Sequence, residues 1–219
     1  MKKLNQILKR KDVGSMGIGA MIIFIAMVLV AGIAATVFIQ VANELQIQAM
    51  YTGQETIGEV SSGVAVMDIE GHVTNTTEGI DLLTISIKGR AGSGDIDLSE
   101  LAIELADNDT KVVLHYDNTQ YADTQTTCTT IFNASAFDLT NCEFGIIVVE
   151  DADGSCKALT PIINKGDLIM LTVNASTSFS PGIAERTDIW GNIIPEMGSW
   201  AMVNFRTPAT FTDFVYDLQ

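Results

Sequence analysis

Lysine and arginine are scarce in most of this chain, and their scarcity excludes one class of partner. Five of the 12 Lys and Arg, but only one of the 27 Asp and Glu, lie in residues 1–14, so 7 basic and 26 acidic residues remain from Ser15 onward, a net charge of −19. Nucleic-acid binding requires clustered basic side chains that neutralise phosphates. We therefore expect no nucleic-acid partner and a solvated acidic surface.

Cysteine is also rare. Cys128, Cys142 and Cys156 form no C-x-x-C pair, which disfavours a zinc knuckle or a thioredoxin-like site. An extracellular body would permit one disulfide among them. The sequence leaves its pairing open.

Catalytic motifs are missing from the whole sequence. It has two histidines, His72 and His115, both in strand-like segments, and no H-E-x-x-H, G-x-S-x-G, phosphate-binding or dinucleotide-binding motif. We therefore predict that the chain is not an enzyme and has no catalytic residues.

Two acidic turns resemble the start of a calcium loop, one at Asp95 and Asp97 and one at Asp151 and Asp153. A complete EF-hand loop needs a bidentate Glu at its twelfth position, and counting from Asp151 that position is Ile162. We interpret both segments as turns and assign no metal ligand and no cofactor. A looser two-carboxylate Ca²⁺ site is the alternative.

The chain does contain one long apolar run, Met16–Ile39, without a charged residue, behind a basic leader that ends at Gly14. As a helix, its 24 residues would extend roughly 36 Å, enough to cross a hydrocarbon core of about 30 Å. The basic leader favours an N-terminus in the cytoplasm and a body outside.

Three interpretations fit this run. It could be a secretory signal peptide, although such apolar regions usually span only about 7–15 residues. It could be an uncut single-span anchor. A prepilin-type leader, cut between Gly14 and Ser15 so that the run stays on the mature protein, best explains why the basic cluster precedes Gly14.

Small residues within the run favour close helix packing. Ala31 and Ala35 form a small-x-x-x-small pair, a spacing that lets helices approach closely, although a lone span also tolerates such residues. The candidate packing residues are Gly17, Gly19, Ala31, Gly32 and Ala35. An amphipathic continuation to about Val60, weakened at Gly53 and Gly58, adds a second surface that needs partners.

The body has the texture of a β domain. Short apolar or alternating segments are separated by Gly, Asp and Asn turns, which indicates an antiparallel sandwich or barrel. The expected strands are 64–73, 82–90, 101–107, 111–117, 144–151, 167–176 and 199–207, with a long irregular connection over 117–141. We therefore predict an α+β chain: a leader (1–14), an assembly helix (15–62) and an outer antiparallel β-sandwich or barrel of immunoglobulin-like type (63–219).

Four Asn-x-Ser/Thr sequons lie in the body. Outside the cell they are candidate N-glycosylation sites: Asn75, Asn108, Asn133 and Asn174.

The residues at both ends carry a family resemblance. The segment GIGAMIIFIAMVLVAGIAATVFI resembles the N-terminal helix of archaellins, the archaeal flagellins. The C-terminal part is similar too, with Gly191, Pro195-Glu196-Met197-Gly198, Val203-Asn204-Phe205, Thr207-Pro208 and Leu218-Gln219.

The resemblance implies a precursor that waits in the cytoplasmic membrane and is cut between Gly14 and Ser15 by a prepilin-type peptidase. The mature chain would polymerise with copies of itself or related archaellin subunits into the extracellular archaellum filament for swimming. Some family members carry a metal ion in the outer domain. The alternatives are a pilin-like subunit of an adhesion filament and, less favoured, a surface-anchored binding domain with a single span.

Overall fold

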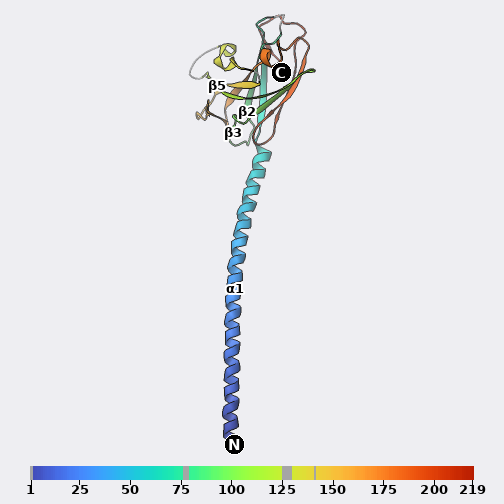
Figure 1. The fold of residues 1–219 in the computed structure, drawn as a ribbon. Coiled ribbons are helices and arrows are strands. Elements are labelled where there is room, and N and C mark those ends of the chain that lie inside the picture. Colours follow the sequence, from blue (N-terminus) through green and yellow to red (C-terminus); the bar gives the residue numbers. More distant parts are fainter. Residues whose placement is uncertain (1, 76–78, 125–129, 141) are drawn as a thin grey trace. The chain divides into compact units, whose positions relative to one another are not determined.

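A computed structural model describes residues 2–75, 79–124, 130–140 and 142–219, with side chains from residue 17 onward (Figure 1). The chain divides into two compact units, Met1–Gln54 and Glu55–Gln219. The first unit is most of the helix α1 (Lys2–Ser61), and the second contains the last turns of α1 and all the strands. We call the second unit the β unit.

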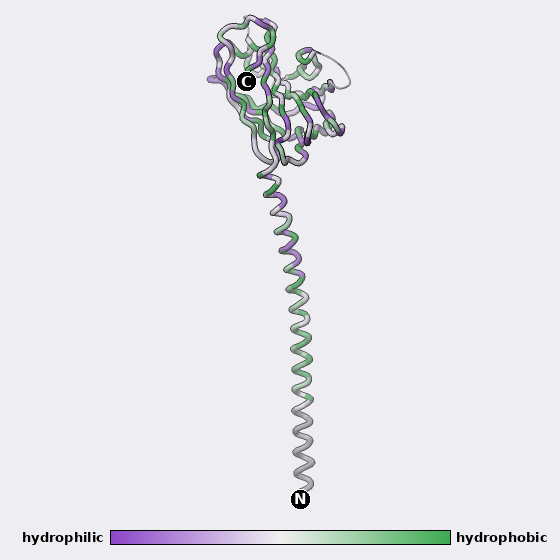
Figure 2. The backbone as a smooth tube through the Cα atoms, turned by 180° about the vertical axis from the view of Figure 1, so that it is seen from behind, coloured by the Kyte–Doolittle hydropathy of each residue, from purple (hydrophilic) through white to green (hydrophobic). Residues whose placement is uncertain are grey.

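Helix α1 is continuous from the leader to the β unit. It passes through Gly53 and Gly58, so neither glycine interrupts it. Figure 2 shows the apolar run in green, followed by a mixed stretch with purple segments. Its part from Gly17 to Ser61 has the length and composition to cross a membrane, and none of its most apolar window is buried in the single chain.

The main sheet has nine strands in the order β11-β10-β4-β5-β6-β9-β2-β1-β12. In chain order these are β1 (Val64–His72), β2 (Leu82–Gly89), β4 (Ala102–Ala106), β5 (Lys111–Asp123), β6 (Glu143–Glu150), β9 (Leu168–Asn174), β10 (Asp188–Ile194), β11 (Ala201–Arg206) and β12 (Val215–Asp217). A small sheet contains β3 (Ile96–Asp97), β7 (Cys156–Lys157) and β8 (Thr160–Ile163).

The nine-stranded sheet curls until its two ends approach each other. Gly63, just before β1, forms a parallel bridge with Ser199, just before β11. The Ser199 amide donates to the Ser62 carbonyl at 2.9 Å. The curled sheet encloses the core, and Ile96, Cys156 and Ile163 of the small sheet pack into the same cluster.

Strand alternation explains which residues fill this core. In β11, Ala201, Val203 and Phe205 are buried while the residues between them are exposed, the period of two expected for a half-buried strand. β2 is buried along most of its length on both faces. This double burial is typical of a strand inside a sheet that is covered on both sides.

A second, smaller cluster lies under two short 3₁₀ helices, η1 (Ile131–Asn133) and η2 (Ser135–Phe137). Here Ala136 and Phe137 pack with Ile147 of β6. The Thr172 hydroxyl of β9 donates to the Ala136 carbonyl at 2.6 Å. This contact satisfies a buried hydroxyl and fixes the covering segment on the sheet.

The structure confirms the predicted fold class, a long apolar helix followed by a mostly antiparallel, curled β unit. The strands β3, β7, β8, β10 and β12 are not among those expected from the sequence, and β5 differs from its prediction in two ways. β5 runs on to Asp123, six residues beyond the predicted end, and it pairs with β6 in parallel. The predicted long connection explains this pair, because parallel neighbours need a crossover and cannot be joined by a tight hairpin.

Candidate functional sites

The apolar surface of α1 is exposed in the part of the chain that the structure describes. From Gly17 to Gly53 every side chain is exposed, including Phe38 at 80%. A helix that is apolar on all sides must lie in lipid or against protein. The surface therefore requires a partner outside the single chain.

The predicted cleavage site and packing residues all lie on this helix. Gly14 and Ser15 fall within α1, and Ala31 and Ala35 are exposed one turn apart. The glycine positions Gly17, Gly19 and Gly32 have no atom of another segment within 4 Å of where a Cβ would stand. These positions can therefore accommodate the close approach of another helix.

The end of α1 is held to the sheet by a polar junction. The Ser93 hydroxyl lies 3.0 Å from both the amide and the carbonyl of Gly63. The Arg90 amide donates to the Gly63 carbonyl at 2.9 Å, and the Arg90 guanidinium donates to the Val64 carbonyl and the Ser199 hydroxyl at 3.2 Å each. The backbone that leaves the helix is thereby fixed by several independent hydrogen bonds.

The Pro195-Glu196-Met197-Gly198 motif closes this junction from the other side. Gly198 has a φ of +98°, and a Cβ there would stand 2.3 Å from the Ser62 carbonyl oxygen. A Cβ at Gly58, on the last turns of α1, would stand 3.2 Å from the Met197 sulfur. The motif therefore needs glycine at position 198, both for its backbone conformation and for space.

A second candidate site is the acidic turn after β6. The Asp151 carboxylate accepts from the amides of Gly154, Ser155 and Cys156 at 2.7–3.3 Å. These local hydrogen bonds agree with the predicted turn. The other predicted acidic turn, at Asp97, accepts from the Ser99 amide at 2.8 Å.

A third carboxylate joins the Asp151 turn, and the sequence analysis missed it. Ligand oxygens of Asp151, Asp153 and Asp167 all lie within 4.8 Å of one another. Asp167 is only 2% exposed; one of its oxygens accepts from the Asn164 amide at 2.8 Å, and Oδ1 has no hydrogen-bond donor among the described residues. A buried carboxylate oxygen without a donor is costly unless a cation or water satisfies it.

Hydrogen bonding and burial shift the pKa values of several side chains at and near the acidic turn. Hydrogen bonds from Ser155 and Asn164 lower the pKa of the Asp153 carboxyl. Burial raises the pKa of the Cys156 thiol to about 12 and that of Tyr121 to about 12, with smaller contributions from nearby groups that include Asp151. The Tyr121 hydroxyl donates to the Cys156 carbonyl at 2.7 Å, so β5 supports the turn from behind. The three carboxylates of Asp151, Asp153 and Asp167 offer the oxygen ligands that a hard cation such as Ca²⁺ prefers.

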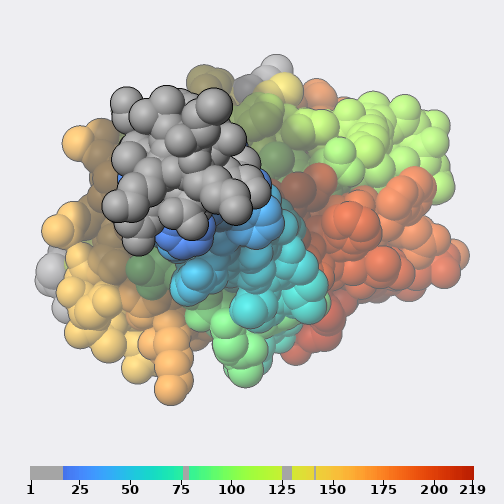
Figure 3. Space-filling view, turned by 90° about the horizontal axis from the view of Figure 1, so that it is seen from below, coloured from blue at the N-terminus to red at the C-terminus, as the bar shows by residue number. Residues whose placement is uncertain are grey.

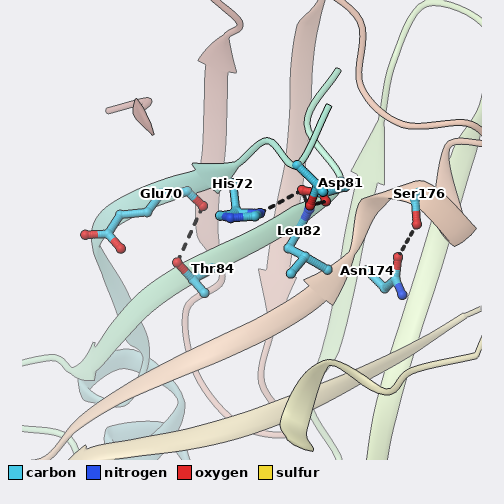
Figure 4. A network of polar contacts seen from close by, with 8 residues as sticks. Glu70, His72, Asp81, Leu82, Thr84, Asn174 and Ser176 are labelled. Carbon is cyan, nitrogen blue, oxygen red and sulfur yellow. Dashed lines mark hydrogen bonds and ion pairs between the residues drawn. The ribbon is translucent and has the colours of Figure 1, made fainter. Parts of the chain in front are cut away.

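His72 makes side-chain contacts within the β unit. His72 Nδ1 lies 3.0 Å from Asp81 Oδ1, the ring stacks on Phe132 with centroids 5.0 Å apart, and the Thr74 hydroxyl donates to the other Asp81 oxygen. Figure 4 shows this pair where β1 meets the start of β2. His115 is exposed on β5. Cys142 and Cys156 are free thiols, and Cys128 lies outside the described residues.

The four sequon asparagines differ in accessibility. Asn75, Asn108 and Asn133 are exposed, although Thr77, the third residue of the first sequon, lies outside the described residues. Asn174 is half-buried and caps the short helix α2 (Ala175–Ser178). Its Oδ1 accepts from the hydroxyl of Ser176, its own sequon residue, at 2.7 Å (Figure 4). Asn174 is therefore the least suited of the four to carry a glycan.

Comparison with known proteins decides the family. A sequence profile described as archaeal-type flagellin matches residues 14–205. This chain belongs to the archaeal-type flagellin family. It is a structural subunit of a filament and not an enzyme, as predicted.

Relatives and solved structures agree with this assignment. Flagellin B2 of Methanocaldococcus jannaschii is 46% identical over 99% of this chain and 100% of its own length. Flagellin B3 of Thermococcus kodakarensis is 34% identical over 95% of this chain and 98% of its own length. The crystal structure of archaeal flagellin FlaB1 from M. jannaschii matches with a TM-score of 0.65 at 36% identity, covering 72% of this chain and 97% of that one.

The archaeal flagellum of Methanospirillum hungatei covers more of the chain. It matches over 92% of this chain and 98% of its own, with a TM-score of 0.62 at 14% identity. At that identity the likeness shows a shared fold.

Proposed function

We propose that the mature chain begins at Ser15 and that its apolar helix forms the core of an archaellum filament that drives swimming. The observation that carries this proposal is the uncovered apolar surface of α1 from Gly17 to Ile39, in a helix whose side chains stay exposed to Gly53. Water around that surface would cost about 25 cal/mol for each Å² left exposed. A bundle of such helices from copies of the chain, or from related archaellin subunits, covers it.

Processing by a prepilin-type peptidase makes the helix available for assembly. The family match begins at residue 14, so most of the basic leader lies outside it. The leader carries five positive charges in its first eleven residues, and these hold the precursor at the cytoplasmic face of the membrane with the body outside. Cleavage after Gly14 removes that charge. The helix then exchanges lipid for the filament core, where Ala31, Gly32 and Ala35 allow close approach.

Assembly on such a helix is open-ended. Copies joined head-to-tail by a helical operation make a heterologous contact that does not close on itself. The acidic β unit then forms the wetted exterior, and exposed Asn75, Asn108 and Asn133 are its preferred glycan acceptors.

The acidic turn adds a structural role to the exterior. Asp151, Asp153 and Asp167 together hold Ca²⁺, which supplies the partner that Asp167 Oδ1 needs. The ion would tie the loop after β6 to the start of β9 and so stabilise the β unit. It takes part in no reaction.

A Gly14→Val substitution tests the processing step. A branched side chain at the cleavage position is expected to block the peptidase, so the full-length precursor accumulates in the membrane and no filaments are sheared from the cells. Val13→Ala, one position earlier, is the matched control and should leave processing and filament yield unchanged. Normal filaments from the Gly14→Val strain would show that the chain is cut elsewhere or not at all.

A further inference from the structure

We propose that the outward face of β4, β5, β10 and β11 is a contact surface for a neighbouring copy of this chain. The proposal rests on the proposed function, in which copies of the chain are brought side by side by their α1 helices. It assigns a second, separate contact to the β unit. We call this surface the lateral face.

The strand register places the lateral face on one side of the sheet. Trp190 of β10 is paired with Asn204 of β11 and Ala106 of β4, and Asn192 is paired with Met202 and Glu104. Partners in a register project to the same side of a sheet. The alternating residues of these strands, among them Ile103, Leu105, Ile193, Val203 and Phe205, are buried in the core.

The lateral face exposes large apolar side chains. Met202 is 68% exposed and Trp200, immediately before β11, is 62% exposed. Trp190 is 45% exposed, and Val113 of β5 lies in register with Glu104 beside it, 38% exposed. Both tryptophans of the chain are thus at the surface. Trp and Met are enriched at protein interfaces, and Trp is also enriched among the residues that dominate the binding energy.

Two ion pairs reduce the negative charge of the lateral face, on which Asp117 of β5 is a further acid. Lys111 Nζ lies 3.0 Å from Glu104 Oε2, and Arg206 Nε lies 3.5 Å from Asp188 Oδ1. Two of the seven basic residues after the leader therefore form ion pairs with acids of this face, in a body with a net charge of −19. Elsewhere the acidic surfaces of two copies repel each other. A face whose charges are largely paired is where such copies can touch at a reduced electrostatic cost.

The lateral face is also continuous with the last turns of α1. Met197, 43% exposed, packs beside Gly58 of α1, and Ile57 and Val60 of those turns are 68% and 80% exposed. In Figure 3 the surfaces of β4 and β5, in yellow-green, and of β10 and β11, in orange-red, lie side by side on one flank of the β unit. No sequon asparagine lies within β4, β5, β10 or β11, and Asn108, a proposed glycan acceptor, lies in the turn between β4 and β5 at the edge of the face.

Hydroxyl-radical footprinting of sheared filaments tests this assignment without altering the chain. Methionine and tryptophan side chains are readily oxidised, so mass spectrometry can follow Met202, Trp200 and Trp190 directly. A side chain that is 68% exposed alone and enters an interface core should oxidise severalfold more slowly in filaments than in subunits released by dissociation. Met67 on β1, 49% exposed and outside the lateral face, is the internal control and should change little.

A matched pair of variants completes the test. Met202→Glu is expected to reduce the yield of sheared filaments severalfold, with unchanged processing and membrane level of the subunit, whereas Met67→Glu should keep the wild-type yield. Filaments that contain the chain with Met202 and Trp200 unprotected, or with Met67 protected equally, would overturn the lateral face and leave the proposed function standing. Sheared filaments that lack the chain would overturn both.

Discussion

Single glycines show how the family motif acts. Gly198 belongs to the C-terminal motif, and the structure gives its physical reason: a positive φ and a backbone carbonyl of Ser62 where a side chain would go. Gly191 is similar, since a Cβ there would stand 1.8 Å from the Glu104 carbonyl oxygen of the neighbouring strand. At both positions the backbone approach requires glycine.

Replacing Gly198 by alanine should therefore loosen the junction. We expect Gly198→Ala to lower the free energy of unfolding of the β unit by about 2 kcal/mol or more, from strain and steric conflict together. Gly94→Ala, at a position with no neighbour within 4 Å, is the control and should stay within about 0.5 kcal/mol of the wild type. Denaturant unfolding of the full chain in detergent, followed by fluorescence of Trp190 and Trp200, measures both. Equal stability of the two variants would contradict the role of Gly198.

Glu70 gives a pH-dependent prediction. Burial raises the pKa of its carboxyl above the ordinary 4.5, and the nearby charges of Asp68 and Asp217 raise it further. The folded state then binds the proton more tightly than the unfolded state, so the stability contribution of Glu70 falls as pH rises from 4.5 through the raised pKa. Above that window the charged Glu70 destabilises the fold. Glu70→Gln should therefore raise the denaturation midpoint at pH 7.

The same reasoning predicts that the higher denaturation midpoint of Glu70→Gln disappears at acidic pH. Well below pH 4.5 Glu70 is protonated in both states, so the variant and the wild type should have similar midpoints there. Glu100→Gln, at an exposed turn, is the control and should show no such pH-dependent gain. A midpoint at pH 7 that is lower in Glu70→Gln than in the wild type would contradict this account.

At the scale of elements, the acidic turn joins the loop after β6 to the segment that begins β9. We expect Ca²⁺ to raise the denaturation midpoint of the wild-type chain, and a ligand at 100 times its Kd would add about 2.7 kcal/mol. Asp167→Asn should abolish most of this gain, because it replaces the buried carboxylate of the cluster. Asp97→Asn, in the other acidic turn, should keep it. A calcium effect that survives Asp167→Asn, or is absent from the wild type, would exclude the site.

Long, regular patterns made the main elements predictable from the sequence. Strong alternation or continuous apolar runs mark β1, β2, β6, β9 and β11, and the observed bounds agree with those predicted to within two residues at each end. β10 was missed because Gly191 and the polar Asn192 interrupt its apolar pattern. β3, β7 and β12 are two or three residues long, too short for a period of two to be recognised.

The cluster of three aspartates was predicted only in part, because one of its members is distant in the sequence. Asp151 and Asp153 are visible as a local cluster, whereas Asp167 follows 14 residues after Asp153 and joins them only through the fold. The extension of β5 past Asp117 was hidden by its polar residues Asn118, Thr119 and Gln120. Tertiary pairing with β6 overrides their weak strand preference.

At the scale of the whole molecule, the chain combines an apolar helix surface, which is unstable in water, with an acidic β unit, which is suited to water. The apolar run of α1 has no cover within the described part of the chain, and the β unit carries the acidic surface. Family membership makes the chain a filament subunit. The proposed order of events, from membrane storage through cleavage to helix packing, accounts for why both surfaces occur in one chain.

The intact mass and N-terminal sequence of the subunit in sheared filaments test this order most directly. The account predicts a single N-terminus at Ser15, with the basic leader absent and the whole apolar run retained. A subunit that begins at Met1 or Lys2 and stays with the membrane fraction would contradict it, because the helix would then be a permanent anchor.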